Sequence, residues 1–191
     1  MVPLSLLWLP IVLSAVIVFV ASSILHMLLT YHHSDYQKLP NEDSVLAGLR
    51  GARLSPGLYI FPFGTHKEMN TPAMIEKYKA GPVGMMTIRP SGPVKMGGYL
   101  AMWFGYCVLV AFFVAYLTGH TVPQNAHYLA VFRVAGTAAF LAFGLSAVSN
   151  GIWKSEPWSM VIKEVIDGLI YALLLAGTFG WLWPHTKMPV L

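Results

Sequence analysis

The chain carries very little charge. Only 10% of its 191 residues are Asp, Glu, Lys or Arg, whereas 56% are apolar. A soluble protein of this length needs more polar surface than that to cover its core. The low charge, together with a mean hydropathy of +0.61, therefore excludes an ordinary soluble domain.

Cysteine and recognisable motifs are also scarce. Cys107 is the single cysteine, which excludes an intramolecular disulfide and a zinc site built from several cysteines. The sequence has no HExxH pair, no Walker-type phosphate loop and no basic run of the kind that binds nucleic acid. These absences argue against a zinc protease, an ATPase and a nucleic-acid-binding protein, and no cofactor is predicted.

Four stretches with almost no charge are long enough to cross a lipid bilayer. At a rise of about 1.5 Å per residue, a helix of about 20 residues spans the ~30 Å hydrocarbon layer. The stretches cover residues 4–29, 98–118, 128–149 and 165–183. We therefore predict an all-α integral membrane protein with four transmembrane helices, folded as a single membrane domain over residues 1–191.

The basic residues between these stretches predict their orientation, because cytoplasmic loops carry an excess of Lys and Arg. Ten of the twelve basic residues lie in the connections after the first and third stretches, which face the same side. The other two are Arg133 and Lys187. We predict a multi-pass protein of the bacterial inner (plasma) membrane, with both termini periplasmic and residues 34–96 cytoplasmic.

Residues 34–96 contain too many helix and strand signals for a plain linker. Asn41, before two acidic residues, and Thr71, before a proline, predict the starts of two helices. The apolar runs 58–61 and 85–88 are typical of short strands, and the direction in which they pair stays open. We expect a small mixed α/β layer that is too small for a core of its own.

Polar residues gather where the first predicted span ends and the fourth begins. Polar side chains at membrane depth are functional candidates by default. His26 and His33 lie seven residues apart, so on one helix they share a face, and Asp167 lies one turn inside the fourth span. The candidate cluster consists of His26, His33, Asp35, His66, Glu68 and Asp167.

Two interpretations of this cluster stay open. In the structural one, which is favoured, Asp167 pairs with Lys163 one helical turn away or with polar groups of the first span. His32, His33, Asp35 and Tyr36 then mark where the first helix meets water. In the other, His26, His33 and Asp167 form a proton relay or a metal site, since imidazole and carboxylate groups are good ligands for zinc and non-haem iron.

Two further patterns bear on partners. Trp153 and Trp158 flank a turn and are typical of anchors at the membrane surface. Gly97, Ala101 and Gly105 recur at four-residue spacing, which favours close helix packing within the chain or with another chain.

The sequence thus predicts a non-catalytic membrane protein. We expect an accessory or scaffolding subunit of a membrane complex, or a self-oligomer, whose partners are the lipid bilayer and other membrane subunits. The alternative is a membrane-embedded enzyme or permeation protein that uses the His/Asp cluster at the cytoplasmic interface.

Overall fold

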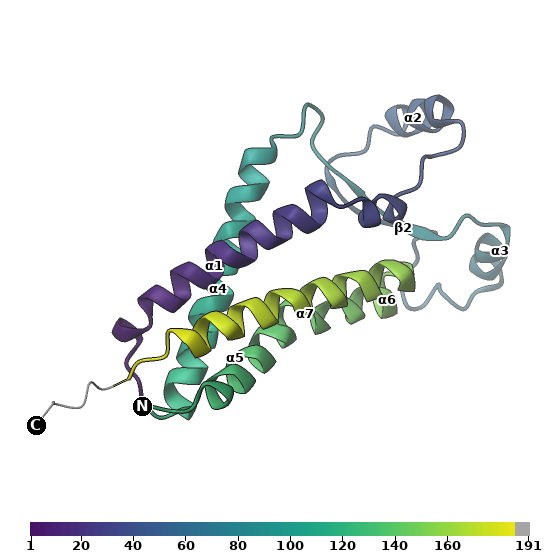
Figure 1. The fold of residues 1–191 in the computed structure, drawn as a ribbon. Helices are drawn as coiled ribbons and strands as arrows, with labels where there is room; N and C mark the ends of the chain where they lie inside the picture. The colour runs from purple at the N-terminus through teal and green to yellow at the C-terminus, as the bar shows by residue number, and fades with distance from the viewer. Residues whose placement is uncertain (186–191) are drawn as a thin grey trace, which may run out of the picture. The chain divides into compact units, whose positions relative to one another are not determined.

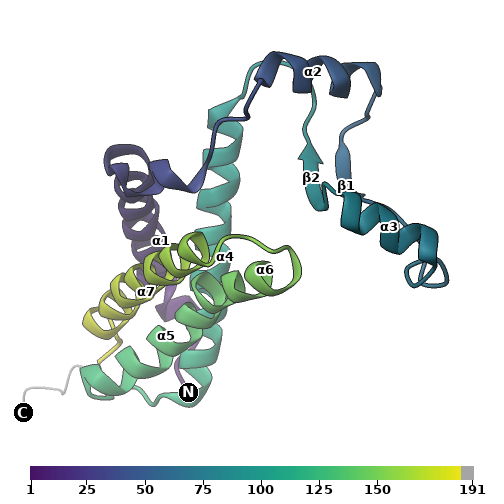
Figure 2. The same ribbon diagram turned by 90° about the vertical axis from the view of Figure 1, so that its right-hand side faces the viewer.

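The computed structural model describes residues 1–185, which form two compact units. The first unit contains Met1–Tyr36 and the described chain from Lys95 onward, and the second is Gln37–Val94. Lys187, one of the two basic residues assigned to the outer side, lies outside the described residues. Figure 1 and Figure 2 show the elements of each unit.

Helices make up the first unit. Its long helices are α1 (Trp8–Ser23), α4 (Met96–Thr121), α5 (Tyr128–Phe143) and α7 (Trp158–Trp181). Shorter pieces are the 3-10 turns η1 (Leu4–Leu6) and η4 (Leu145–Ala147) and the helix α6 (Val148–Trp153). After α1 the chain continues as a π-helical turn η2 (Ile24–Leu28) and a 3-10 turn η3 (Thr30–Asp35).

Three helical segments are long and apolar enough to cross a membrane. They are Trp8–Leu28, Met96–Thr121 and Tyr128–Trp153, the last of which joins α5, η4 and α6. They contain the bulk of the first three predicted stretches and support the prediction of a membrane protein. The fourth predicted stretch lies in α7, which is not among these three segments.

The core of the first unit lies between α1, α4, α5 and α7. α7 packs against α5 and α1, and α4 packs against α1 and α5. Small side chains such as Ala111, Ala139 and Ala176 are fully buried between them. Such residues let backbones approach closely, which matters in lipid because acyl chains solvate large apolar side chains as well as protein does.

Glycines tighten the contact between α5 and α7 further. A Cβ placed on Gly168 would lie 2.3 Å from the Cα of Gly144, and one on Gly180 would lie 2.6 Å from the ring of Tyr128. These two glycines are therefore used within the chain. On α4, by contrast, a Cβ on Gly97 or Gly105 would meet open space.

The second unit is the predicted small mixed α/β layer. It contains α2 (Glu42–Gly51), β1 (Gly57–Phe61), α3 (Pro72–Ala80) and β2 (Gly84–Ile88). The strands pair antiparallel, with Gly57 opposite Ile88. Figure 2 shows the two strands side by side. Both helix starts are confirmed. Thr71 accepts a hydrogen bond from the Met74 amide, whereas Asn41 adopts a left-handed conformation and makes no side-chain cap.

Candidate functional site

The candidate site lies where the chain leaves α1 and turns back against α7. The helical hydrogen bonding widens to a π turn at Ile24–Leu28, and Leu29 is extended, which ends the helix. The turn η3 then packs against α7. His33 therefore does not follow His26 on one helix face as the seven-residue spacing suggested, and His32 lies beside His26 instead.

His32 lies between two carboxylates. Its Nδ1 is 2.7 Å from Oδ2 of Asp35, and its Nε2 is 2.8 Å from Oδ2 of Asp167. The two carboxylate side chains are only 4% and 3% exposed. A neutral imidazole donates from one nitrogen only, so the two hydrogen bonds require one further proton, held by the ring or by a carboxyl group.

Lys163 and Tyr31 complete this network from either end. The Lys163 ammonium lies 2.5 Å from Oδ1 of Asp35, where the sequence predicted Asp167 as its partner, and it also donates to the Tyr31 carbonyl. The Tyr31 hydroxyl donates to Oδ1 of Asp167. With His32 protonated, cations and anions alternate along the chain of contacts, so no buried charge is left without a partner.

The surroundings shift the pKa of two of these groups. Burial tends to raise the pKa of Asp35, but the hydrogen bonds from Lys163 and His32 outweigh it and hold that pKa below its usual value. Burial raises the pKa of Tyr31, and its hydrogen bond to Asp167 raises it further. At neutral pH, Asp35 is therefore an anion and the Tyr31 hydroxyl is a neutral donor.

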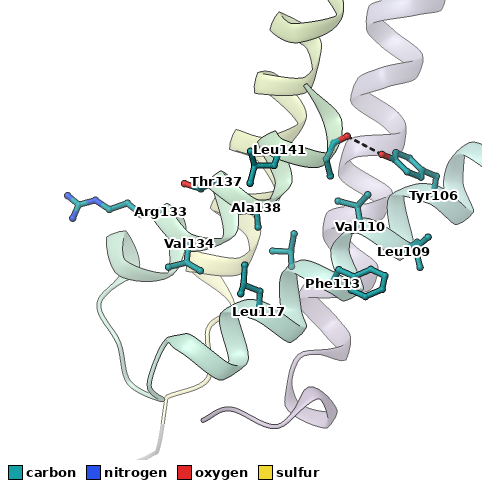
Figure 3. Close-up of a pocket in the computed structure, with 12 residues that line it drawn as sticks. Tyr106, Leu109, Val110, Phe113, Leu117, Arg133, Val134, Thr137, Ala138 and Leu141 are labelled. Atoms are coloured by element: carbon teal, nitrogen blue, oxygen red, sulfur yellow. Dashed lines mark hydrogen bonds between the residues drawn. The ribbon is translucent and has the colours of Figure 1, made fainter. Parts of the chain in front are cut away.

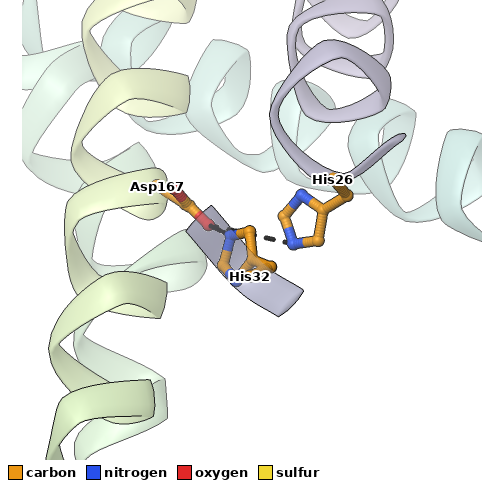
Figure 4. A group of neighbouring side chains, drawn as sticks. All are labelled: His26, His32 and Asp167. Atoms are coloured by element: carbon orange, nitrogen blue, oxygen red, sulfur yellow. Dashed lines mark hydrogen bonds and ion pairs between the residues drawn. The ribbon is translucent and has the colours of Figure 1, made fainter. Parts of the chain in front are cut away.

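His26 joins the cluster from the π turn. Its Nδ1 is 3.2 Å from the carbonyl oxygen of Ser22, and its Nε2 is 3.8 Å from Oδ2 of Asp167. Figure 4 shows its ring beside that of His32, with ring centroids 4.3 Å apart and an angle of 19° between the planes. Because a carbonyl oxygen only accepts, Nδ1 carries a proton, and Nε2 is the nitrogen that faces the carboxylate.

A cavity of about 820 Å³ opens beside this cluster. His26, Glu164, Asp167 and Asn150 are polar residues of its lining, while Leu100, Trp103 and Phe143 supply apolar walls. Among the residues that the structure describes, no Lys or Arg belongs to this lining. The hydroxyl of Tyr171 is buried in this lining and has no hydrogen-bond partner among residues 1–185. The cavity is therefore amphipathic.

A second cavity, of about 690 Å³ between α4 and α5, has a different character. Its lining is apolar except for a few groups such as Thr137 and Arg133, and Figure 3 shows the Arg133 guanidinium pointing away from the other labelled side chains. The Tyr106 hydroxyl donates to the Ala142 carbonyl there, so it is satisfied within the chain. Such a surface mainly suits hydrocarbon chains.

The remaining predicted residues lie outside the cluster or in the other unit. His33 is exposed on η3. His66 and Glu68 belong to the second unit, so their participation stays a prediction. Trp153 and Trp158 are 82% and 55% exposed, and their role as anchors at the membrane surface stays a prediction.

Sequence reasoning missed two members of the cluster. The sequence predicts no role for Tyr31 and places His32 at the boundary with water. The three-residue spacing from His32 to Asp35 is the one local signal that marks this pair, because such residues are neighbours on a helical turn.

Comparison with known proteins supplies no family for this chain. No family model matches it, and neither the curated proteins nor the solved structures gave a match. Its function is therefore inferred from the side chains themselves.

Proposed function

We propose that this is a four-span membrane protein that binds a small amphipathic molecule in the cavity beside the His/Asp cluster. The observation that carries the proposal is the cavity's two-sided lining, with the unpartnered Tyr171 hydroxyl at membrane depth. A buried hydroxyl without a partner costs about 1–3 kcal/mol. Less than 1 Å² of this hydroxyl oxygen is exposed, so a polar group of a bound molecule would remove that cost after a small shift of the neighbouring side chains.

The lining favours one class of ligand. Glu164 and Asp167 bring carboxylates to the cavity, and no Lys or Arg lines it, so a neutral or cationic head group is preferred over an anionic one. Leu100, Trp103 and Phe143 suit a hydrocarbon or aromatic tail. The volume of about 820 Å³ lies within the usual range for small-molecule pockets.

In this proposal α7 is the fourth span and the cluster faces the cytoplasm. α7 has 24 residues, and at about 1.5 Å per residue it is long enough for the hydrocarbon layer. The excess of basic residues in the two connections on the cluster side supports a cytoplasmic location, and both termini then lie on the periplasmic side of the bacterial inner membrane.

Cysteine labelling on intact cells tests this orientation. With Cys107 replaced by Ser, a membrane-impermeant maleimide is expected to label Thr121→Cys at the end of α4 and to leave Ser44→Cys in α2 unlabelled until the cells are opened. Labelling of Ser44→Cys alone on intact cells contradicts the orientation.

Ligand binding is tested on the full chain purified in a mild detergent. Mass spectrometry of the extracted small molecules is expected to show a neutral or cationic amphiphile enriched over the bulk membrane lipids. Ser146 lines the cavity and is exposed, so Ser146→Trp is expected to fill it and remove that molecule. Leu145→Trp is the matched control, since Leu145 is exposed but lines neither described cavity.

Two outcomes contradict ligand binding. One is an extract with the same composition as the bulk lipids. The other is equal retention of the amphiphile by Ser146→Trp and Leu145→Trp.

A second function, as an accessory subunit or self-oligomer, is favoured by one face of α4. Gly97, Gly98 and Gly105 have no atom within 4 Å of an added Cβ, although glycines of α5 and α7 are packed tightly. Small residues that pack against nothing leave room for a helix of another chain. The native mass in mild detergent, compared with that of Gly105→Leu, tests this. A wild-type monomer without a partner contradicts it.

A further inference from the structure

We propose that His26, His32 and Asp167 bind one divalent first-row transition-metal ion, such as Zn²⁺ or Fe²⁺. This goes beyond the binding of an amphiphile, and it does not require the cavity to be filled. The three side chains come from η2, η3 and α7, and one ligand atom of each lies within 4.8 Å of the other two. Figure 4 shows the two rings and the carboxylate pointing toward one another.

Each histidine is oriented by a partner on its other nitrogen. The Ser22 carbonyl accepts from Nδ1 of His26, and the Asp35 carboxylate accepts from Nδ1 of His32. Both rings therefore direct Nε2 toward the centre of the cluster. Metal-binding histidines in proteins are held in this way, by a carbonyl or carboxylate behind the ring that fixes its tautomer.

The third ligand is oriented as well. Oδ1 of Asp167 accepts from the Tyr31 hydroxyl, which leaves Oδ2 toward both imidazoles. Behind His32, the Lys163 ammonium holds Asp35 at 2.5 Å. These outer contacts are those of a site whose ligands are fixed before the ion arrives.

His26 provides the observation that a purely structural network leaves unexplained. The contacts that join Lys163, Asp35, His32 and Asp167 form a continuous network without it. With a neutral ring and a proton on Nδ1, the lone pair of Nε2 faces Oδ2 of Asp167 at 3.8 Å, so two acceptors face each other. A cation between these atoms turns that unfavourable contact into two coordinate bonds.

Metal binding needs only small shifts of the three ligand atoms. Ligand atoms about 2.0–2.2 Å from a tetrahedral ion lie about 3.4 Å apart. Nε2 of His32 and Oδ2 of Asp167, now 2.8 Å apart, would separate, while Nε2 of His26, now 3.8 Å from that oxygen, would move closer. The ion takes the place of the proton between His32 and Asp167, and that proton leaves to solvent. Two imidazoles, one carboxylate and positions open to the cavity form the ligand set of catalytic zinc and non-haem iron centres.

Zinc titration of the full chain tests the site. Protein purified in mild detergent is stripped with a chelator, titrated with Zn²⁺ by calorimetry and analysed for bound metal. One Zn²⁺ per chain is expected. His26→Ala is the decisive variant because its side chain is 49% exposed, so the fold tolerates its loss; at least a hundredfold weaker binding is expected. His33→Ala, an exposed histidine on the neighbouring turn, is the matched control and is expected to bind as wild type.

Further variants separate the ligands from the residue that orients them. Asp35→Asn is expected to weaken binding about 10–100-fold, as removal of an outer partner does. If His32→Ala or Asp167→Asn does not fold, the intensity of the visible absorption of Co²⁺ in the wild-type protein, compared with that in His26→Ala, reports whether the ion is held in a four- or five-coordinate protein site that needs His26. Ser146→Trp is expected to keep its Zn²⁺, so that metal binding and ligand binding fail or succeed separately.

Three results overturn the proposal. They are the absence of one bound Zn²⁺ per wild-type chain, unchanged affinity in His26→Ala, and an equal loss of affinity in His33→Ala.

Discussion

The two faces of α7 join the bundle by different means. Toward α5 the contact is made by glycine, since Gly168 approaches Gly144 too closely for any side chain. Toward η3 it is made by charge, through Asp167 to His32 and through Lys163 to Asp35. Asp167 and Gly168 are adjacent in the chain, so both kinds of contact meet at one point of the helix.

The difference separates architecture from chemistry. Close glycine packing gains dispersion energy in lipid and needs no ligand. A buried network of ion pairs costs desolvation energy, and apolar residues of similar size often stabilise a fold equally well. The glycine face therefore has a sufficient explanation in packing, whereas the charged face is where a binding or proton-transfer role would add an explanation that stability alone does not supply.

The largest loss of stability is expected when one charged residue is removed from the network that joins α7 to η3. Asp35→Ala leaves Lys163 and His32 without their shared anion, and breaking a buried pair in this way costs about 3–5 kcal/mol. The free energy of unfolding, measured by denaturant titration in detergent, is expected to fall by that amount. His33→Ala is expected to change it by less than about 0.5 kcal/mol, as exposed substitutions usually do.

A double variant sharpens this result. Asp35→Leu combined with Lys163→Leu removes both charges of one pair, and it is expected to recover most of the lost stability. A loss below 1 kcal/mol for Asp35→Ala would mean that the network contributes little to the fold.

A smaller effect is expected on the glycine face. Gly168→Ala places a methyl group against the α5 backbone, and overpacking of this kind costs about 1–3 kcal/mol or more. Gly105→Ala is the matched control on α4, where the added methyl group meets open space. The same loss of stability in both variants would show that the helix backbone rather than the close contact determines the cost.

Local signals in the sequence predicted the fold far better than the site. The apolar stretches, the helix starts at residues 42 and 72 and the two strands depend on neighbouring residues, so they are visible in one sequence. The partners of Lys163 and Asp167 depend on where η3 lies, which no local pattern sets. Asp35 is 128 residues away from Lys163 along the chain.

The structure brings His32 to the carboxylates, where the sequence predicted His33, and the difference has a specific physical cause. The sequence predicts a regular helix through His26 and beyond, but the helix widens to a π turn and ends at Leu29. No proline or glycine lies between His26 and His33 to mark this change. The rotation it produces brings a different histidine to the carboxylates.

A change of about 1 kcal/mol in the free energy of unfolding is expected at Tyr171, one turn beyond Asp167 on α7. Tyr171→Phe removes a buried hydroxyl without a described partner, so stability without ligand is expected to stay constant or rise by up to about 1 kcal/mol, while retention of the amphiphile falls. Tyr106→Phe is the control, because it removes a hydrogen bond to the Ala142 carbonyl and is expected to lose about 0.5–1.5 kcal/mol. A clear loss of stability in Tyr171→Phe without ligand would contradict an unsatisfied hydroxyl.

The smallest effect is expected at Glu68 in the second unit, an exposed counterpart of the buried carboxylates. The Thr65 amide and hydroxyl both donate to Glu68 at 2.8 Å, and these hydrogen bonds hold its pKa below the usual value. Because the folded-state pKa is lowered, the stabilisation is present above the usual pKa of a glutamate and is lost as the pH falls through the lowered one.

An NMR titration of Glu68 checks this expectation. In Thr65→Val the amide donor stays and the hydroxyl is lost, so the pKa of Glu68 is expected to rise part of the way toward its usual value, with little change in stability at neutral pH. An unchanged titration would assign the lowered pKa to the amide of Thr65 and the charge of Lys77 alone. Glu68 and Asp35 then differ in how much their charge depends on partners. An exposed carboxylate such as Glu68 keeps its charge in water with or without a partner. A buried carboxylate such as Asp35 depends on its partners to stay charged.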